Sequence, residues 1–186
     1  VDYLLTLVDL NSIRKLKIVI DAGNGMAGHT APAVFQRLNA EVTEMFFELD
    51  GTFPNHEANP IEEENLAQLK QMVKKQRADI GLAFDGDADR CFLVDEKGNA
   101  VNPSLLTALI AERELTKHPN SSIIYNLISS RAVREVIEEH GGKAIRSRVG
   151  HSFIKALMAE SGAVFGGEHS GHFYFSDFWR ADSGML

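Results

Sequence analysis

Three aspartates at every second position are the residues of this sequence best suited to chemistry. Asp85, Asp87 and Asp89 follow the apolar stretch "IGLAF" in "FDGDADR", and Arg90 comes directly after them. Like charges this close repel one another, so either all three point into water, as in a solvated acidic turn, or a cation lies among them. Hard carboxylate oxygens favour Mg²⁺ or Ca²⁺ over a softer metal. The guanidinium of Arg90 can neutralise the cluster, and it also suits a phosphate oxygen held on the same metal. The stretch predicts a metal that activates a phosphoryl group.

An EF-hand is one alternative for the same aspartates. Aspartates at loop positions one, three and five match its pattern, and Glu96 falls at position twelve. However, Arg90 stands at position six, where the sharp turn of an EF-hand requires glycine, and the entering segment reads as a strand. We therefore reject the EF-hand.

A glycine-rich turn offers a second alternative. Gly23, Gly25 and Gly28 match the G-x-G-x-x-G pattern after an apolar segment, with acidic residues at 44 and 48, about 20 residues further on. This pattern is typical of dinucleotide-binding turns, although glycines also serve a plain strand-to-helix turn, and Asp21 at the strand end would crowd a pyrophosphate. The alternative function is a nucleotide-binding or regulatory α/β module that uses the turn from Gly23 to Gly28 without catalysis.

A second polar loop, "FGGEHSGHFYF", carries groups suited to a sugar ring. Glu168 can accept two hydrogen bonds from vicinal hydroxyls, and Ser170 can donate and accept one. The glycines on either side permit close backbone approach to a ligand. A polar turn with solvated histidines is the competing interpretation, and it stays open for His169.

Strands that alternate with helices must position these loops. The first half of the chain predicts strands over 18–20, 41–49 and 78–84, helices over 30–38 and 62–76, and a hairpin over 91–101. The second half predicts helices over 103–117, 131–140 and 152–161, and strands over 122–127, 143–148, 163–167 and 172–175. The polar loops follow predicted strands, where ligand loops of parallel sheets lie.

This order of elements predicts an α/β fold of two consecutive three-layer α/β/α units with mixed, mainly parallel sheets. The predicted domain boundary lies near Asn102–Pro103 and divides the chain into domains 1–101 and 102–186. Both ends look cut, because the chain begins at Val1 and stops at Leu186 in "RADSGML", which reads as a helix start capped by Asp182 or Ser183. We expect a piece of a longer protein.

Composition excludes several classes of function. The 186 residues are 44% apolar and carry a net charge of −7, without a basic run longer than Lys74–Lys75. A nucleic-acid or anionic-membrane surface is therefore not indicated. The single cysteine, Cys91, cannot form an internal disulfide, which fits a reducing compartment. Because no apolar run reaches the roughly 18 residues of a membrane span and no signal peptide stands at the start, we expect a cytoplasmic protein.

Taken together, the motifs resemble one family. "FDGDADR", "GGEHSGH" and "DAGNGMAG", with "FPNHEANP", "SSRAV", "RVGHSFIKALM" and "DFWRADSGM", are similar to the α-D-phosphohexomutase superfamily, in its phosphomannomutase/phosphoglucomutase branch. The resemblance covers nearly the whole chain. Members of that family have four domains, and residues 1–101 resemble the second, with the metal-binding loop. Residues 102–186 resemble most of the third, with the sugar-specificity loop.

The resemblance implies roles for eight residues. Three would hold a Mg²⁺ that also contacts a phosphoserine, and a fourth would lie near that phosphate: Asp85, Asp87 and Asp89, with Arg90. Glu168 and Ser170 would bind sugar hydroxyls. His172 and His151 would orient the phosphate or assist proton transfer, while a buried structural role for His151 stays open.

The implied activity is that of an isomerase, an intramolecular phosphotransferase. It would interconvert the 1- and 6-phosphates of mannose or glucose through a hexose 1,6-bisphosphate. Such a reaction needs a stored phosphate, a metal that neutralises charge on the phosphoryl oxygens, and a sugar-binding site that accepts the ring in two orientations. In the family, the phosphoserine and the phosphate-gripping loop belong to the first and fourth domains, which have no counterpart in this chain. We therefore expect the isolated chain to be inactive.

Overall fold

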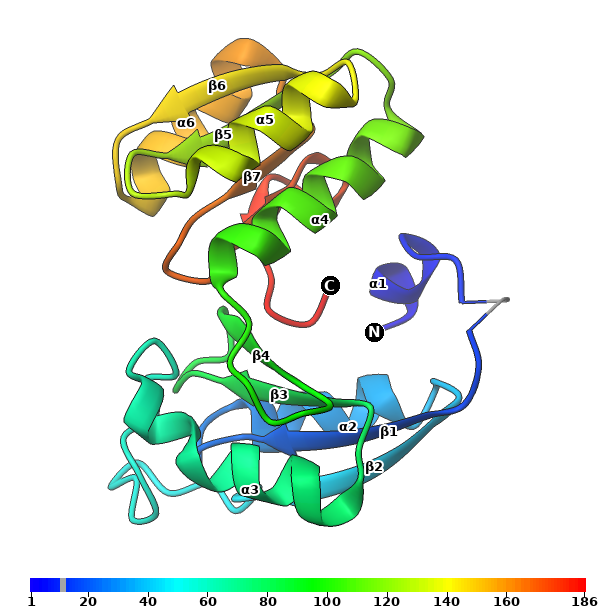
Figure 1. Cartoon of the computed structure of the whole chain (residues 1–186), viewed down its shortest axis with the longest axis vertical. Helices are drawn as coiled ribbons and strands as arrows, with labels where there is room; N and C mark the ends of the chain where they lie inside the picture. Colours follow the sequence, from blue (N-terminus) through cyan, green and yellow to red (C-terminus); the bar gives the residue numbers. More distant parts are fainter. Residues whose placement is uncertain (11–12) are drawn as a thin grey trace. The chain divides into compact units, whose positions relative to one another are not determined.

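The computed structural model describes residues 1–10 and 13–186 (Figure 1). Its contacts divide the chain into two compact units. The first unit comprises Val1–Val101 with Gly184–Leu186, and the second comprises Asn102–Ser183. No helix in the described part of the chain has the length and apolar character needed to cross a membrane.

The first unit is built on a four-stranded sheet with the order β2-β1-β3-β4. The strands β2, β1 and β3 are parallel, and β4 is antiparallel to β3. In chain order the elements are α1 (Asp2–Thr6), β1 (Leu16–Asp21), α2 (Ala27–Phe35), β2 (Ala40–Met45), the 3-10 helix η1 (Glu63–Leu66), α3 (Ala67–Gln76), β3 (Ile80–Phe84) and β4 (Cys91–Asp95).

Helices cover both faces of this sheet because successive residues of β1 point to opposite sides. Val19 packs in one apolar cluster with Leu69 and Val73 of α3. Its neighbours Ile18 and Ile20 lie in a second cluster, which includes the first residue of α2. All five side chains are nearly inaccessible to solvent, and burial of each stabilises the unit by about 1.5–3 kcal/mol.

The second unit contains a five-stranded sheet with the order β6-β5-β7-β8-β9. The strands β6, β5 and β7 are parallel, and β8 and β9 add to the edge in antiparallel fashion. Its elements are α4 (Pro103–Lys117), β5 (Ser122–Asn126), α5 (Arg131–Glu139), β6 (Lys143–Ser147), α6 (His151–Ser161), β7 (Phe165–Gly167), β8 (Phe173–Phe175), the 3-10 helix η2 (Ser176–Phe178) and β9 (Ala181–Asp182).

Two glycines of β7 show that the helices of this unit lie on opposite faces of its sheet. A Cβ atom on Gly166 would stand 2.8 Å from Ile154 of α6, whereas a Cβ atom on Gly167 would stand 2.4 Å from Thr107 of α4. Because consecutive strand residues point to opposite faces, α6 covers one face and α4 the other. The helix α5 packs beside α4 (Figure 1).

The predicted fold class is confirmed. Both units have helices on two faces of a mixed sheet whose central strands are parallel. Several predicted boundaries are shifted, however. The strand predicted over 41–49 ends at Met45, because Phe46 adopts a left-handed conformation with φ +55°. The predicted helix over 62–76 begins as the 3-10 helix η1.

The helix start predicted at Asp182 or Ser183 is wrong. Ala181–Asp182 instead forms β9, which pairs with β8 in antiparallel fashion. Trp179 and Arg180 both adopt φ +57°, so the chain reverses after η2 and returns along β8. An open strand edge supplies hydrogen-bond partners that the local sequence pattern does not reveal.

Candidate functional site

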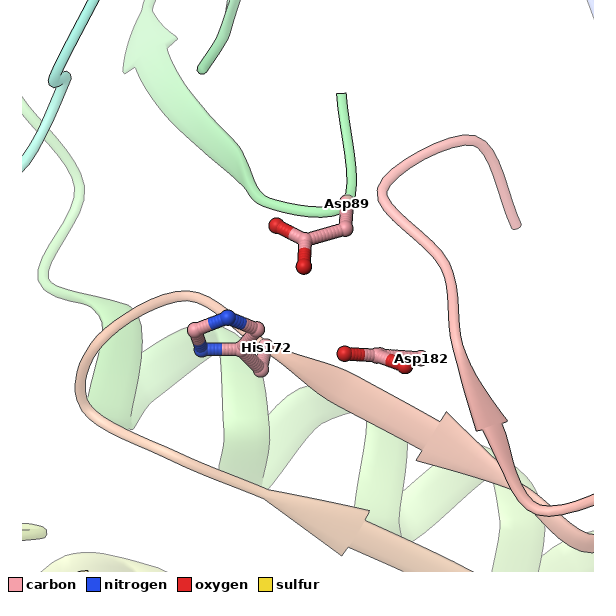
Figure 2. Close-up of side chains that lie close together, drawn as sticks. All are labelled: Asp89, His172 and Asp182. Carbon is pink, nitrogen blue, oxygen red and sulfur yellow. The ribbon is translucent and has the colours of Figure 1, made fainter. Parts of the chain in front are cut away.

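The three aspartates lie at the carboxyl end of the first sheet. Asp85 follows β3 directly and is 2% exposed, whereas Asp89 is half-buried and Asp87 is exposed. One carboxylate oxygen from each lies within 4.8 Å of the others. Residues 85–90, here named the aspartate loop, therefore gather three hard oxygen donors at one point, and Figure 2 shows Asp89 extending from this loop.

Arg90 holds the buried member of this cluster. Its Nε donates to Oδ2 of Asp85 at 2.6 Å, and its backbone N–H donates to Oδ1 at 3.1 Å. The Arg90 guanidinium also lies 3.9 Å from Asp89 Oδ1, and it donates to Asn59 Oδ1 at 3.4 Å. Between Asp85 and Arg90, Ala88 adopts φ +64°, which turns the aspartate loop back on itself. Of the two roles weighed for this guanidinium, neutralising the carboxylates is the one visible in the structure.

The glycine-rich turn after β1 supports the aspartate loop. A Cβ atom on Gly25 would stand 2.6 Å from the carbonyl oxygen of Gly86, and one on Gly28 would stand 2.2 Å from that of Phe47. The backbone N–H of Met26 donates to the Gly86 oxygen at 2.9 Å. These glycines are needed because neighbouring backbone approaches them closely.

The same turn has its N–H groups engaged within the protein. Gly23 donates to the carboxylate of Asp21, Gly25 to the carbonyl of Ala22 and Met26 to the aspartate loop. A dinucleotide-binding turn needs such groups to face a pyrophosphate. The packing of the turn accounts for its glycines, and no finding supports the nucleotide-binding alternative.

Cys91, the first residue of β4, takes no part in this chemistry. Burial raises the pKa of its thiol to about 12, with a smaller contribution from the Asp85 charge. The thiol is therefore protonated at neutral pH and unsuited to act as a nucleophile.

Glu168 lies at the carboxyl end of the second sheet, where it is buried rather than exposed to solvent. Only 2% of the residue is exposed. Its Oε1 accepts hydrogen bonds from Asn126 Nδ2 at 3.2 Å and from the Gly150 backbone N–H at 3.0 Å, and its Oε2 accepts from Tyr174 Oη at 2.8 Å. Gly150 precedes α6, so the positive end of the helix dipole also favours this carboxylate.

This arrangement changes the role expected for Glu168. A carboxylate offers about four acceptor positions, and three are used by protein donors in the described part of the chain. The side chain joins the ends of β5 and β7 to the start of α6 and to β8. Sequence reasoning missed Asn126 and Tyr174, because nothing local in "IIYNLI" or "HFYF" marks them as partners of a distant carboxylate.

Ser170 and His172 form a hydrogen-bonded pair in the same loop. Ser170 Oγ lies 2.9 Å from His172 Nδ1, which is also 3.8 Å from Glu168 Oε2. The His172 ring stacks on Tyr174 with centroids 6.2 Å apart. The structure therefore brings Glu168, Ser170 and His172 together in one loop at the end of β7.

Asp182 was not predicted as a site residue, yet it lies near His172 in the second unit (Figure 2). It accepts a hydrogen bond from Lys155 Nζ at 2.7 Å. Burial acts to raise the pKa of Asp182, but the Lys155 hydrogen bond and the charges of Lys155 and His172 outweigh it, so the pKa lies below its ordinary value. The strand β9, which the sequence did not predict, brings this carboxylate to the loop.

His169 and His151, two further histidines considered in the sequence analysis, differ in their surroundings. His169 is more than a solvated turn residue, because its Nδ1 lies 3.0 Å from the buried Oγ of Ser104, which accepts the Ser130 N–H at 3.0 Å. This contact ties the loop to the starts of α4 and α5. His151 is the first residue of α6 and is exposed, so the buried structural role considered for it is wrong.

Comparisons with known proteins agree on one family. Residues 1–98 match the profile of phosphoglucomutase/phosphomannomutase alpha/beta/alpha domain II, and residues 102–186 match that of domain III. A phosphomannomutase/phosphoglucomutase of Pseudomonas syringae pv. tomato is 45% identical over 171 residues, which cover 92% of this chain and 37% of that protein.

Solved structures show the same relationship. A phosphoglucomutase/phosphomannomutase family protein from Burkholderia thailandensis superposes with a TM-score of 0.93 at 39% identity, covering 99% of this chain and 40% of that one. N-acetylphosphoglucosamine mutase of Aspergillus fumigatus, solved in complex with GlcNAc-6P and magnesium, shares the fold at 14% identity with a TM-score of 0.64, over 89% of this chain and 38% of that one.

The chain thus spans little more than a third of the length of the curated relative it matches. Over that span, both sheets and both loops correspond to two consecutive domains of one kind of enzyme. The chain belongs to the phosphoglucomutase/phosphomannomutase family, and it represents the second and third α/β/α domains.

Proposed function

We propose that this chain supplies the Mg²⁺-binding and sugar-binding parts of a phosphohexomutase that interconverts hexose 1-phosphate and hexose 6-phosphate. Domain 1–101 would carry the metal loop and domain 102–186 the sugar-specificity loop. The observation that carries the proposal is the convergence of one carboxylate oxygen each of Asp85, Asp87 and Asp89 within 4.8 Å, at the carboxyl end of β3.

The donor set of the aspartate loop fits Mg²⁺. Asp85, Asp87 and Asp89 offer only oxygen ligands, which a hard cation prefers. Arg90 keeps the Asp85 carboxylate in one orientation, as groups behind a metal ligand commonly do. Bound there, Mg²⁺ would neutralise charge on the oxygens of a transferring phosphoryl group. The Arg90 guanidinium would lie near that phosphate.

The loop after β7 has the groups needed to hold a sugar. Ser170 presents a hydroxyl, and Glu168 retains one of its acceptor positions for a sugar hydroxyl. The contact with Ser170 orients the His172 ring at Nδ1, so its Nε2 would exchange a proton with a substrate oxygen. His151, at the start of α6, would help to orient the phosphate.

The substrate would be a mannose or glucose phosphate, with a hexose 1,6-bisphosphate as intermediate. The phosphoserine that stores the phosphoryl group belongs to a family domain that residues 1–186 do not match, and the phosphate-gripping loop belongs to another. The overall reaction is an isomerisation by intramolecular phosphoryl transfer. A cytoplasmic location would suit both these substrates and the lone thiol of Cys91.

Calorimetric titration with Mg²⁺ tests the metal assignment. We expect Asp87→Asn to weaken Mg²⁺ binding at least about 10-fold, because it removes an anionic ligand. Asp87 is exposed, so this change should leave the fold intact. The matched control is Asp2→Asn in α1, which should bind as the unaltered chain does. Equal Mg²⁺ affinity in the Asp87 and Asp2 variants would refute the proposed metal site.

A coupled assay tests the need for the phosphoserine. The chain of residues 1–186 should not convert glucose 1-phosphate to glucose 6-phosphate, even with Mg²⁺ and glucose 1,6-bisphosphate present, because it cannot store the phosphoryl group. The full-length Pseudomonas syringae relative serves as the positive control. Turnover by the chain alone, above the rate of a sample without protein, would refute this requirement.

A further inference from the structure

A histidine outside the predicted site occupies an unusual position behind the aspartate loop. His56 belongs to the segment 53–59, here named the cover segment. Its Nε2 lies 3.0 Å from Oδ2 of Asp21, and its Nδ1 lies 2.9 Å from the carbonyl oxygen of Glu57. A carboxylate and a carbonyl can only accept hydrogen bonds, so both ring nitrogens must donate. With Asp21 ionised, the geometry therefore favours the imidazolium form of His56.

The cation has a clear electrostatic partner. Asp21 ends β1 and is 1% exposed, and a buried carboxylate without a partner would be costly. The His56 ring also meets the Phe46 ring in a T-shaped arrangement, with centroids 5.4 Å apart. The charged group that the ring contacts through Nε2 is Asp21. The hydrogen bond to Asp21 also raises the pKa of His56, although partial burial opposes this.

This ion pair is linked to the aspartate loop through the glycine-rich turn. The second oxygen of Asp21 accepts the Gly23 N–H at 2.9 Å. Three residues later in the turn, the N–H of Met26 donates to the carbonyl of Gly86, inside the aspartate loop, at 2.9 Å. A change in the orientation of Asp21 would therefore move the glycine-rich turn. The turn itself holds Gly86, between Asp85 and Asp87, through the hydrogen bond from Met26.

The cover segment makes a second connection to the same loop. Asn55 Nδ2 donates to Asn24 Oδ1 at 2.7 Å, which attaches the segment to the turn. At its other end, Asn59 Oδ1 accepts from Nη1 of Arg90 at 3.4 Å. Between these contacts His56 is the charged anchor of the segment.

We propose that His56, as a cation paired with Asp21, is a positioning residue that holds the cover segment and the glycine-rich turn in the arrangement that fixes the aspartate loop. The metal-binding consequence rests on the proposed Mg²⁺ site, whereas the effect on loop geometry does not. The two ring nitrogens of His56 contact Glu57 and Asp21 rather than a proposed metal ligand. His56 therefore acts through Asp21, Met26 and Asn59.

Nuclear magnetic resonance tests the charge state directly. Nitrogen shifts of the His56 ring in the unaltered chain at pH 7 should show both nitrogens protonated. A neutral His56 ring at pH 7 would overturn the proposal.

Amide hydrogen exchange tests the effect on the loop without any metal. In His56→Gln, which keeps a donor for Asp21 but removes the charge, exchange at Met26 and Arg90 should become several-fold faster. His29→Gln is the matched control and should leave both amides unchanged. Exchange at Ile20, in the buried strand β1, reports whether the unit remains folded. Unchanged exchange at Met26 and Arg90 in His56→Gln would refute the proposal that His56 positions the aspartate loop.

Magnesium titration separates this inference from the proposed function. His56→Gln should weaken Mg²⁺ binding by up to about 10-fold, the lower end of the loss seen for groups in direct contact with a metal ligand, because His56 acts at one remove through Asp21. The double variant Asp21→Asn with His56→Gln removes both charges and should recover part of the affinity. If the unaltered chain binds no Mg²⁺, the proposed metal site fails, and the exchange data alone then decide whether His56 positions the loop. Normal affinity in His56→Gln would contradict the metal-binding consequence.

Discussion

Glu168→Ala is expected to destabilise the second unit by about 3 kcal/mol or more, because each buried polar group left unsatisfied costs about 1–3 kcal/mol. The change would leave Asn126 Nδ2, the Gly150 N–H and the Tyr174 hydroxyl without their shared acceptor. Asn126 and Tyr174 are fully buried, so water cannot easily replace the lost carboxylate. Urea unfolding, followed through the amide signal of Ile124 in β5, measures the loss.

Two further variants separate hydrogen bonding from charge at this position. Glu168→Gln keeps an amide oxygen for Asn126 and Gly150, and its NH₂ can donate to the Tyr174 hydroxyl oxygen, so it should lose less stability than alanine. The control is Glu160→Ala, an exposed position near the end of α6, which should change stability by no more than about 0.5 kcal/mol. If the alanine variants at 168 and 160 are equally stable, the carboxylate does not hold these elements together.

Arg90→Met is expected to destabilise the first unit by about 2–4 kcal/mol, somewhat less than the 3–5 kcal/mol of a fully buried pair. The reason is that Asp85, whose side chain is 3% exposed, would keep its charge and lose its cationic partner. The loss is smaller than the full value because the Arg90 side chain is 22% exposed. The amide signal of Ile20 in β1 follows unfolding of this unit in urea.

A second arginine–aspartate pair provides the matched control for this change. Arg14 and Asp79 are also 2.6 Å apart, but the Arg14 side chain is 67% exposed, so Arg14→Met should have a much smaller effect. Arg90→Lys should not restore stability, because a single ammonium cannot reproduce the contacts of Nε with Asp85 and of Nη1 with Asn59. Similar losses in the two methionine variants would contradict the importance of burial at Arg90.

Much of the fold could be predicted because its signals are local. The helix α4 has the predicted bounds, since Asn102 caps it by accepting the Ser104 N–H and Pro103 occupies its first position. The layers follow from β1, where apolar residues cover both faces, as they do in a parallel strand buried between helices. The position of the two polar loops then follows from the parallel pairing of the strands they succeed.

Other features depend on contacts between residues that are distant in the sequence. The strand β9 forms because an edge of β8 is available, and "RADSGML" alone resembles the start of a helix. Similarly, the end of β2 at Met45 depends on the conformation of Phe46, whose C-terminal neighbours continue a strand-like pattern in the sequence. A short window of sequence does not show which distant segment will pair with it, so neither feature could be predicted locally.

The sequence by itself determined the chemistry available to this protein: three oxygen donors at every second position, an arginine beside them, and a glutamate and a serine in a glycine-rich loop. Only the tertiary structure decided how these groups are used. It buries Glu168 among three donors, pairs Arg90 with Asp85 and pairs His56 with Asp21. Residue type and spacing limit which interactions are possible, but burial and long-range pairing decide which form, because a charge removed from water must find its partner wherever the fold places one.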